Sequence, residues 1–170
     1  MLFLFHNFVP EVESTTMNIG DVAPHIVLYD TDRKQVNLSD FLGQRVILLF
    51  FPAAWTGMCT AEMCAVSDDL TFYQSLKCTI FGISVDTPFA LKRFKEDKNI
   101  KFALLSDFNK NVIRAYEVYR EDFVCDLHGV ANRAVFIIGS DGTIQYREIL
   151  ELPGIMPDFD AAKRALETIH

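Results

Sequence analysis

The sequence predicts an α/β fold in which helices flank a central mixed β-sheet. Three observations lead to this prediction. Apolar strand patterns alternate with helical patterns through the middle of the chain. Hairpin patterns lie at both ends of this alternating region. The 170 residues, 50% of them hydrophobic, have the length and composition of one domain with a substantial core.

The expected elements follow one another along the chain. Residues 46–51 are an unbroken apolar run and residues 79–85 a largely apolar one, which predicts central strands covered on both faces. Residues 140–142, Ser-Asp-Gly, supply the turn chemistry of the late hairpin. The predicted strands are residues 25–29, 35–38, 45–51, 79–85, 102–105, 134–138 and 143–149. The predicted helices are residues 39–42, 59–76, 88–98, 109–116 and 158–169.

No internal repeat or low-complexity linker divides the chain. We therefore expect residues 1–17 to be an N-terminal extension and residues 18–170 to form one domain. Residues 1–5 are apolar but lack the basic region, long apolar stretch and cleavage site of a secretory signal. No run approaches the ~18 consecutive apolar residues that a membrane-spanning helix needs. These features predict a cytoplasmic protein that does not bind membranes.

Charge and cysteine content exclude several classes of function. The net charge of −7 and the absence of basic runs argue against a nucleic-acid binder, because phosphate contacts need clustered Lys and Arg. A chain of this size does not need disulfides for stability, which favours reduced thiols in a reducing compartment. The spacing of the cysteines does not fit a zinc site, and we expect no metal or other cofactor. The four cysteines are Cys59, Cys64, Cys78 and Cys125.

The most informative segment follows the first central strand, where Cys59 stands at the start of a predicted helix. Unpaired backbone N–H groups and the positive end of the helix dipole stabilise a thiolate at such a position. Thr56, three residues upstream, can hydrogen-bond the sulfur. Pro52 stiffens the intervening loop and shields it from water. The segment therefore has the features of a reactive thiol.

The pattern P-x-x-x-T-x-x-C formed by Pro52, Thr56 and Cys59 resembles the active-site motif of the peroxiredoxins, the alkyl hydroperoxide reductase C and thiol-specific antioxidant superfamily. The resemblance extends over about residues 17–169. Within this superfamily, the sequence most resembles the branches of alkyl hydroperoxide reductase E and bacterioferritin comigratory protein. Further matching segments are residues 20–24, 85–86, 133–138 and 141–142.

The resemblance implies a thioredoxin-like fold with an N-terminal β-hairpin and a thiol-dependent peroxidase activity. Hydrogen peroxide, alkyl hydroperoxides or peroxynitrite would be reduced through a sulfenic acid on Cys59, without a cofactor. Arg133 aligns with the family arginine that contacts the cysteine sulfur and the substrate oxygens, and Glu62 with the acidic residue that holds this arginine. The implied partners are the peroxide, a thiol reductant such as thioredoxin or glutaredoxin, and a second copy of the chain in a homodimer.

The roles of the other cysteines stay open at this point. Cys64 is a candidate resolving thiol, since some relatives have one at this spacing, or else a packing residue. In a continuous helix the two cysteines are offset by about 140°, so a disulfide requires the first turns to unwind. Cys125 lies in a polar region and is an alternative resolving thiol, whereas Cys78 borders a core strand and is interpreted as structural.

Two more side chains and one loop have competing interpretations. Trp55 is expected at the rim of the pocket or in a dimer contact, as the family resemblance implies. His128 invites a Cys–His pair, but nothing places it near Cys59, so a solvated loop histidine is favoured. Residues 151–157 are expected to connect to the last helix, with packing beside the substrate entrance as the alternative.

Two functions from other classes compete with the peroxidase. A thiol–disulfide oxidoreductase would use Cys59 and Cys64, but the sequence lacks the C-x-x-C spacing that permits exchange without unwinding a helix. A peroxide sensor or holdase of thioredoxin fold would react with peroxide on a stoichiometric scale only.

Overall fold

The computed structural model describes residues 16–169. Most of the predicted N-terminal extension, residues 1–17, therefore lies outside the described residues. Met17 is buried in the core, and its backbone N–H donates to Glu117 at 3.2 Å. The domain thus includes the last residue of the predicted extension.

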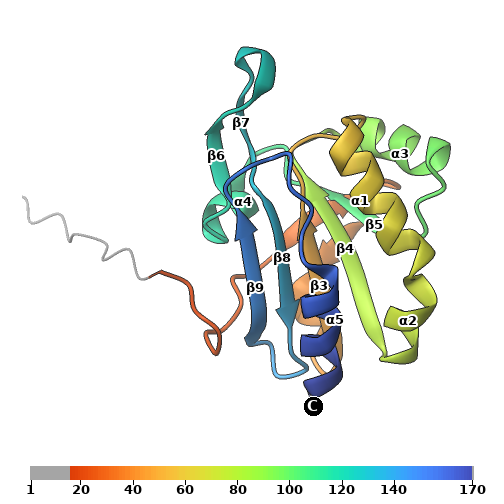
Figure 1. The fold of residues 1–170 in the computed structure, drawn as a ribbon, viewed down its shortest axis with the longest axis vertical. Helices are drawn as coiled ribbons and strands as arrows, with labels where there is room; N and C mark the ends of the chain where they lie inside the picture. The colour runs from red at the N-terminus through yellow and green to blue at the C-terminus, as the bar shows by residue number, and fades with distance from the viewer. Residues whose placement is uncertain (1–15, 170) are drawn as a thin grey trace, which may run out of the picture.

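A seven-stranded mixed sheet forms the centre of the molecule, as predicted (Figure 1). Its strand order is β2-β1-β5-β4-β3-β8-β9. The pairs β3–β4 and β4–β5 are parallel, and the other pairs are antiparallel. The strands are β1 (Val27–Asp30), β2 (Gln35–Asn37), β3 (Arg45–Phe50), β4 (Cys78–Ser84), β5 (Ala103–Ser106), β8 (Arg133–Ile138) and β9 (Ile144–Leu150).

Helices cover both faces of the sheet and bury its alternating side chains. Ile47 and Leu49 of β3 face a core formed with α1, α3 and α5, whereas Val46 and Leu48 face a second core that includes α4. The helices are α1 (Gly57–Asp68), α2 (Leu70–Ser75), α3 (Pro88–Asp97), α4 (Asn111–Ala115) and α5 (Phe159–Thr168). Among residues 16–169, no helix combines the length and the apolar character needed to cross a bilayer.

Several elements differ from the sequence-based expectation. The helix predicted for residues 59–76 begins two residues earlier and is divided at Asp69, whose ψ of 7° leaves the helical range. The helix predicted at residues 39–42 is the 3₁₀ turn η1 (Leu38–Phe41), which begins one residue earlier. Asn37 caps it, and the Asn37 side chain accepts a hydrogen bond from the Ser39 N–H. The break at Asp69 leaves α1 as an independent helix of 12 residues that carries Cys59.

A second, two-stranded sheet was not predicted. It consists of β6 (Tyr119–Asp122) and β7 (His128–Ala131), joined by the short helix η2 (Val124–Asp126). Figure 1 shows this hairpin projecting beyond the end of the main sheet. The charged strand β6 and the four-residue strand β7 show no alternation of apolar and polar residues, so only pairing within the folded chain defines these strands.

The sheet register determines where the site forms. Phe50, the last residue of β3, pairs with Ala134 of β8. Arg133 therefore lies beside the point where the chain leaves β3 and enters α1. Two segments that are far apart in the sequence converge at this end of the sheet.

Candidate active site

Cys59 is the third residue of α1, and its side chain is buried at 1% exposure. Thr56 precedes the helix in an extended conformation, and its carbonyl accepts the first helical hydrogen bond, from the Thr60 N–H at 2.9 Å. The amides of the first turn have no partner within a helix, and they surround a residue at this position. The sulfur is thus in the electrostatic environment expected from the sequence.

Arg133 and Glu62 meet Cys59 in the interior. Arg133 Nη2 donates to Cys59 Sγ at 3.4 Å. Arg133 Nη1 forms an ion pair with Glu62 Oε2, and both side chains are almost completely buried. Glu62 follows Cys59 by three residues and therefore lies on the same face of α1. The structure thus brings together Cys59, Arg133 and Glu62, the three ionisable side chains that were predicted from the sequence to lie at the site.

Burial and ion pairing act in opposite directions on this cluster. Burial raises the pKa of Glu62 to about 7, although Arg133 opposes the rise. Burial alone would lower the pKa of Arg133, but the charges of Glu62 and Cys59 outweigh it and hold the pKa above its usual value. The guanidinium therefore stays charged beside the sulfur, whereas Glu62 is the group whose charge changes near neutral pH.

The raised pKa of Glu62 predicts a pH-dependent stability. Because the folded chain holds this proton more tightly than the unfolded chain, the stabilisation is fully present below pH 4.5 and is lost as the pH rises through about 7. Glu62→Gln is expected to flatten the fall in the free energy of unfolding between about pH 5 and about pH 8. Denaturant unfolding at about pH 5 and at about pH 8 measures the free energy of unfolding of wild type and of Glu62→Gln. Glu96→Gln, a change at an exposed residue, is the control. If the free energy of unfolding changes equally with pH in Glu62→Gln and Glu96→Gln, the result would contradict the raised pKa of Glu62.

The loop between β3 and α1 is fixed to the end of β4 by Asp86. Its Oδ2 accepts from the Ala54 N–H at 2.8 Å and from the Ser84 hydroxyl at 2.8 Å. The Ser106 hydroxyl donates to the Asp86 carbonyl at 2.6 Å and connects β5 to the same point. Asp86 was not among the site residues predicted from the sequence, although it directly follows the end of a predicted central strand.

Within this loop, Thr56 and Trp55 have defined positions. The Thr56 hydroxyl donates its hydrogen to the Ala53 carbonyl at 3.0 Å rather than to the sulfur, so its oxygen is available as an acceptor. Trp55 has a φ of 70°, an uncommon conformation for an aromatic residue. Trp55 is 47% exposed, and its ring packs edge-on against the ring of Phe94 in α3, with 5.4 Å between the ring centroids. Pro52, near the start of the same loop, is buried.

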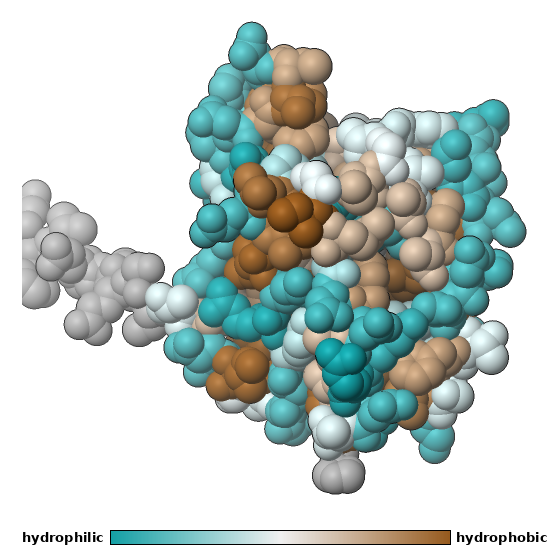
Figure 2. Space-filling model, viewed as in Figure 1, coloured by the Kyte–Doolittle hydropathy of each residue, from teal (hydrophilic) through white to brown (hydrophobic). Residues whose placement is uncertain are grey.

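A backbone group completes the surroundings of Arg133. The Pro153 carbonyl accepts from Arg133 Nη2 at 3.0 Å, so the two hydrogens of this nitrogen serve Cys59 and Pro153. Pro153 belongs to the loop between β9 and α5, over which Figure 2 shows hydrophobic surface. Leu152 and Ile155 of this loop are exposed. The loop thus contacts the site residue Arg133 as well as connecting to the last helix.

The structure separates the other candidate residues from this cluster. Cys64 lies in α1, half-buried, with its Sγ 4.0 Å from the Lys98 carbonyl. Burial raises the pKa of Cys78 to about 12, which makes it an inert thiol at neutral pH. Cys125 is exposed in η2 at the tip of the projecting hairpin. His128 begins β7, exposed, with its Nδ1 3.3 Å from Asp122 Oδ1.

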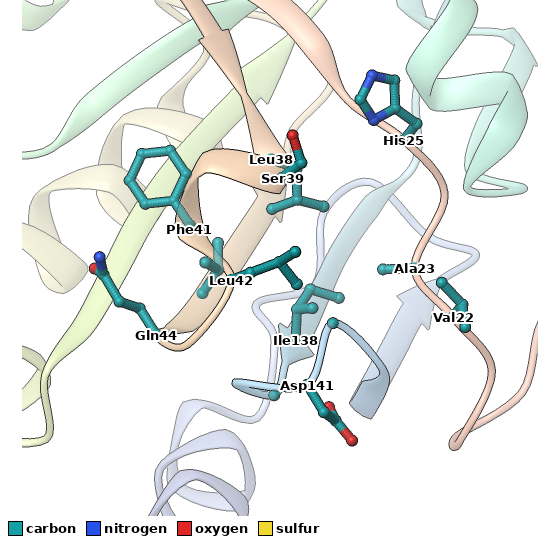
Figure 3. Close-up of a pocket in the computed structure, with 13 residues that line it drawn as sticks. Val22, Ala23, His25, Leu38, Ser39, Phe41, Leu42, Gln44, Ile138 and Asp141 are labelled. Carbon is teal, nitrogen blue, oxygen red and sulfur yellow. The ribbon is translucent and has the colours of Figure 1, made fainter.

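A cavity of about 300 Å³ lies at the opposite end of the sheet (Figure 3). Val46 and Ile138 pair with each other at that end and line it together with Leu38, Phe41 and Leu42. None of the residues around Cys59 contributes to this cavity. Within residues 16–169, no three His, Cys, Asp or Glu side chains are gathered in a way that would hold a metal ion.

A thioredoxin-like α/β fold with a buried cysteine at a helix start, hydrogen-bonded to an arginine, fits the class of thiol-dependent peroxidases. Comparison with known proteins supports this class. The model of the AhpC/TSA family matches residues 19–147. The chain is 37% identical over 131 residues to peroxiredoxin Bcp of Escherichia coli K12, which covers 76% of this chain and 84% of that protein. The chain belongs to the AhpC/TSA family and is a peroxiredoxin.

Solved structures agree with this assignment. Peroxidoxin BcpB from Mycobacterium tuberculosis superposes with a TM-score of 0.79 at 28% identity, covering 91% of this chain and 99% of that one. The reduced 2-Cys peroxiredoxin of Plasmodium vivax gives a TM-score of 0.76 at 27% identity, with 88% and 80% covered. The predicted fold class, family and enzyme class are therefore confirmed, and the resemblance to the bacterioferritin comigratory protein branch is confirmed with them.

Proposed function

We infer that Cys59 is the peroxidatic thiol of this peroxiredoxin. The observation that carries the inference is the 3.4 Å hydrogen bond from Arg133 Nη2 to Cys59 Sγ in a buried setting at the start of α1. A fixed cation and the amides of a helix N-terminus both stabilise the thiolate. Of the four cysteines, Cys59 is the one bonded to a guanidinium among the described residues.

The reaction is a displacement at oxygen. The Cys59 thiolate attacks one peroxide oxygen, an S–O bond forms, and the O–O bond breaks with its electron pair on the departing oxygen. That oxygen takes up a proton and leaves as water from hydrogen peroxide or as an alcohol from an alkyl hydroperoxide, whereas peroxynitrite releases nitrite. In each case Cys59 becomes a sulfenic acid. Arg133 stabilises the negative charge on the departing oxygen, and a preorganised donor in a dry site does so better than water.

Thr56, Pro52 and Glu62 act on the same step. Because the Thr56 hydrogen is engaged with Ala53, the Thr56 oxygen accepts the hydrogen of the peroxide and orients it. The buried Pro52 helps to exclude water from the loop. Glu62 holds Arg133 in place through the buried ion pair. We propose these roles together with that of Cys59.

The sulfenic acid is reset by an external thiol. Cys59 and Cys64 lie in one continuous helix, where five residues give an axial separation of about 7.5 Å and a rotation of about 140°. A disulfide between them would require α1 to unwind over its first turns. The geometry favours direct reduction of Cys59, with Cys64 as a packing residue.

Intact-mass analysis after one equivalent of hydrogen peroxide tests both the activity and the resetting step. Wild type and Cys64→Ser are both expected to gain one oxygen atom, because neither forms an internal disulfide. A loss of two hydrogens in wild type, absent in Cys64→Ser, would demonstrate a Cys59–Cys64 bridge and contradict direct reduction. An unchanged mass in wild type would contradict the peroxidase function itself.

The substrate is a peroxide and the electron donor is a thiol, as for the family. We propose hydrogen peroxide, alkyl hydroperoxides or peroxynitrite as the oxidants, and thioredoxin, glutaredoxin or a similar thiol reductant as the electron donor. We also propose a homodimer in which the half-exposed ring of Trp55 contacts the second copy, because an exposed aromatic side chain is a typical interface anchor. The four free cysteines suit a cytoplasmic location.

A further inference from the structure

Arg120 joins three segments next to the site. It lies half-buried on β6, the first strand of the projecting hairpin. Its Nη1 donates to the Glu151 carbonyl at 2.6 Å and to Asn132 Oδ1 at 3.2 Å. Its Nε donates to the Asp122 carbonyl at 2.6 Å, within the same hairpin. One guanidinium therefore connects the hairpin, the residue before Arg133 and the loop after β9.

The loop that Arg120 holds is the one that contacts Arg133. Glu151 directly follows β9, and two residues later the Pro153 carbonyl accepts from Arg133 Nη2. Among the described residues, two hydrogen bonds connect residues 151–154 with other segments, and Arg120 and Arg133 donate them. Leu152 adds little apolar packing to this loop, because it is 61% exposed. The position of the Pro153 carbonyl therefore depends on Arg120.

The Pro153 carbonyl in turn orients the guanidinium of Arg133. Arg133 Nη2 has two hydrogens, and the carbonyl takes one in a direction that leaves the other for Cys59 Sγ. The planar guanidinium rotates as a unit, so a displaced carbonyl changes the direction of the Nη2 hydrogens. Asn132, which Arg120 also contacts, is the neighbour of Arg133 on the backbone. Arg120 thus constrains Arg133 in two ways, through the loop that carries the Pro153 carbonyl and through the neighbouring residue Asn132.

We propose that Arg120 is a positioning residue of the peroxidase site, which holds the loop of residues 151–154 so that the Pro153 carbonyl aligns Arg133 with Cys59. This proposal rests on the proposed function of Cys59. It assigns a role to the hairpin, because β6 carries the residue that fixes the loop. Arg120 touches neither the sulfur nor the substrate, and it acts through Pro153 and Arg133.

Arg120→Gln and Arg120→Lys test the proposal, with Arg93→Gln on the exposed side of α3 as the control. The rate of Cys59 oxidation by hydrogen peroxide is measured by rapid mixing, and thiolate formation by the pH dependence of iodoacetamide alkylation. Arg120→Gln is expected to slow oxidation about 10-fold and to shift the alkylation profile to higher pH, because a small misalignment of a catalytic group is costly. The control is expected to match wild type in both measurements.

Arg120→Lys separates positioning from charge. Lysine keeps the positive charge but cannot donate to three acceptors in a fixed fork, so it is expected to remain several-fold slower than wild type. Full recovery by lysine, or a wild-type rate in Arg120→Gln, would overturn the proposal. If Arg120→Gln does not fold, the lysine variant decides alone. Failure of the proposed function is distinguishable, because it would appear in wild type as peroxide oxidation that does not involve Cys59.

Discussion

Cys59→Ser is expected to abolish peroxide consumption in the presence of a thiol reductant. Serine has the same branching as cysteine and is slightly smaller, but its hydroxyl does not ionise near neutral pH and cannot form a sulfenic acid. In this variant Arg133 Nη2 faces a neutral hydroxyl, which is not an effective nucleophile here, in place of the Cys59 sulfur. Loss of the nucleophile removes the step on which the other groups act, so the rate should fall by at least about 10³-fold.

The control for this prediction is another cysteine of the same chain. Cys125→Ser changes an exposed thiol at the hairpin tip, away from the guanidinium of Arg133. It is expected to retain the wild-type rate with hydrogen peroxide. Continuous measurement of peroxide loss compares the three proteins, and undiminished turnover in Cys59→Ser would refute the mechanism.

Arg133→Ala is expected to slow the oxidation of Cys59 by about 10²-fold through the loss of charge stabilisation in the transition state. The variant also leaves Glu62 buried without a counter-charge, which costs roughly 3–5 kcal/mol of stability when the carboxylate stays charged. Protonation of Glu62 reduces this cost, since burial already raises its pKa to about 7. The catalytic and stability effects therefore need separate measurements.

Glu62→Gln combined with Arg133→Ala supplies the matched comparison. The double variant removes the unpaired carboxylate, so its thermal stability should exceed that of Arg133→Ala while its oxidation rate stays low. Rapid mixing with hydrogen peroxide gives the rate, and thermal unfolding gives the stability. An Arg133→Ala rate within error of wild type would remove Arg133 from the catalytic site.

Apolar runs made the main sheet predictable. The strands β3, β4 and β8 are buried on both faces, and their sequences contain few polar residues. The hairpin β6–β7 lacks such a signal, because its strands are stabilised by pairing and by long-range bonds such as Asn132 N–H to the Val118 carbonyl at 2.6 Å. Tertiary contacts of this kind cannot be read from local composition.

The candidate site was predictable to the extent that side chains define it. Cys59, Glu62 and Arg133 were selected from the motif and its surroundings, and the structure places them in contact. The Pro153 carbonyl has no side-chain signature, and its role depends on how the loop after β9 folds back. The single-helix prediction for residues 59–76 was wrong because the break at Asp69 involves neither glycine nor proline.

Cys59 alone among the four cysteines is expected to react rapidly with peroxide. Reduced protein is treated with less than one equivalent of hydrogen peroxide in the presence of dimedone, which traps sulfenic acids, and the label is located by peptide mass mapping. Sequencing of the labelled peptide by fragmentation separates Cys59 from Cys64, and the label is expected on Cys59 and on none of Cys64, Cys78 and Cys125. Label on another cysteine, with Cys59 unmodified, would contradict it.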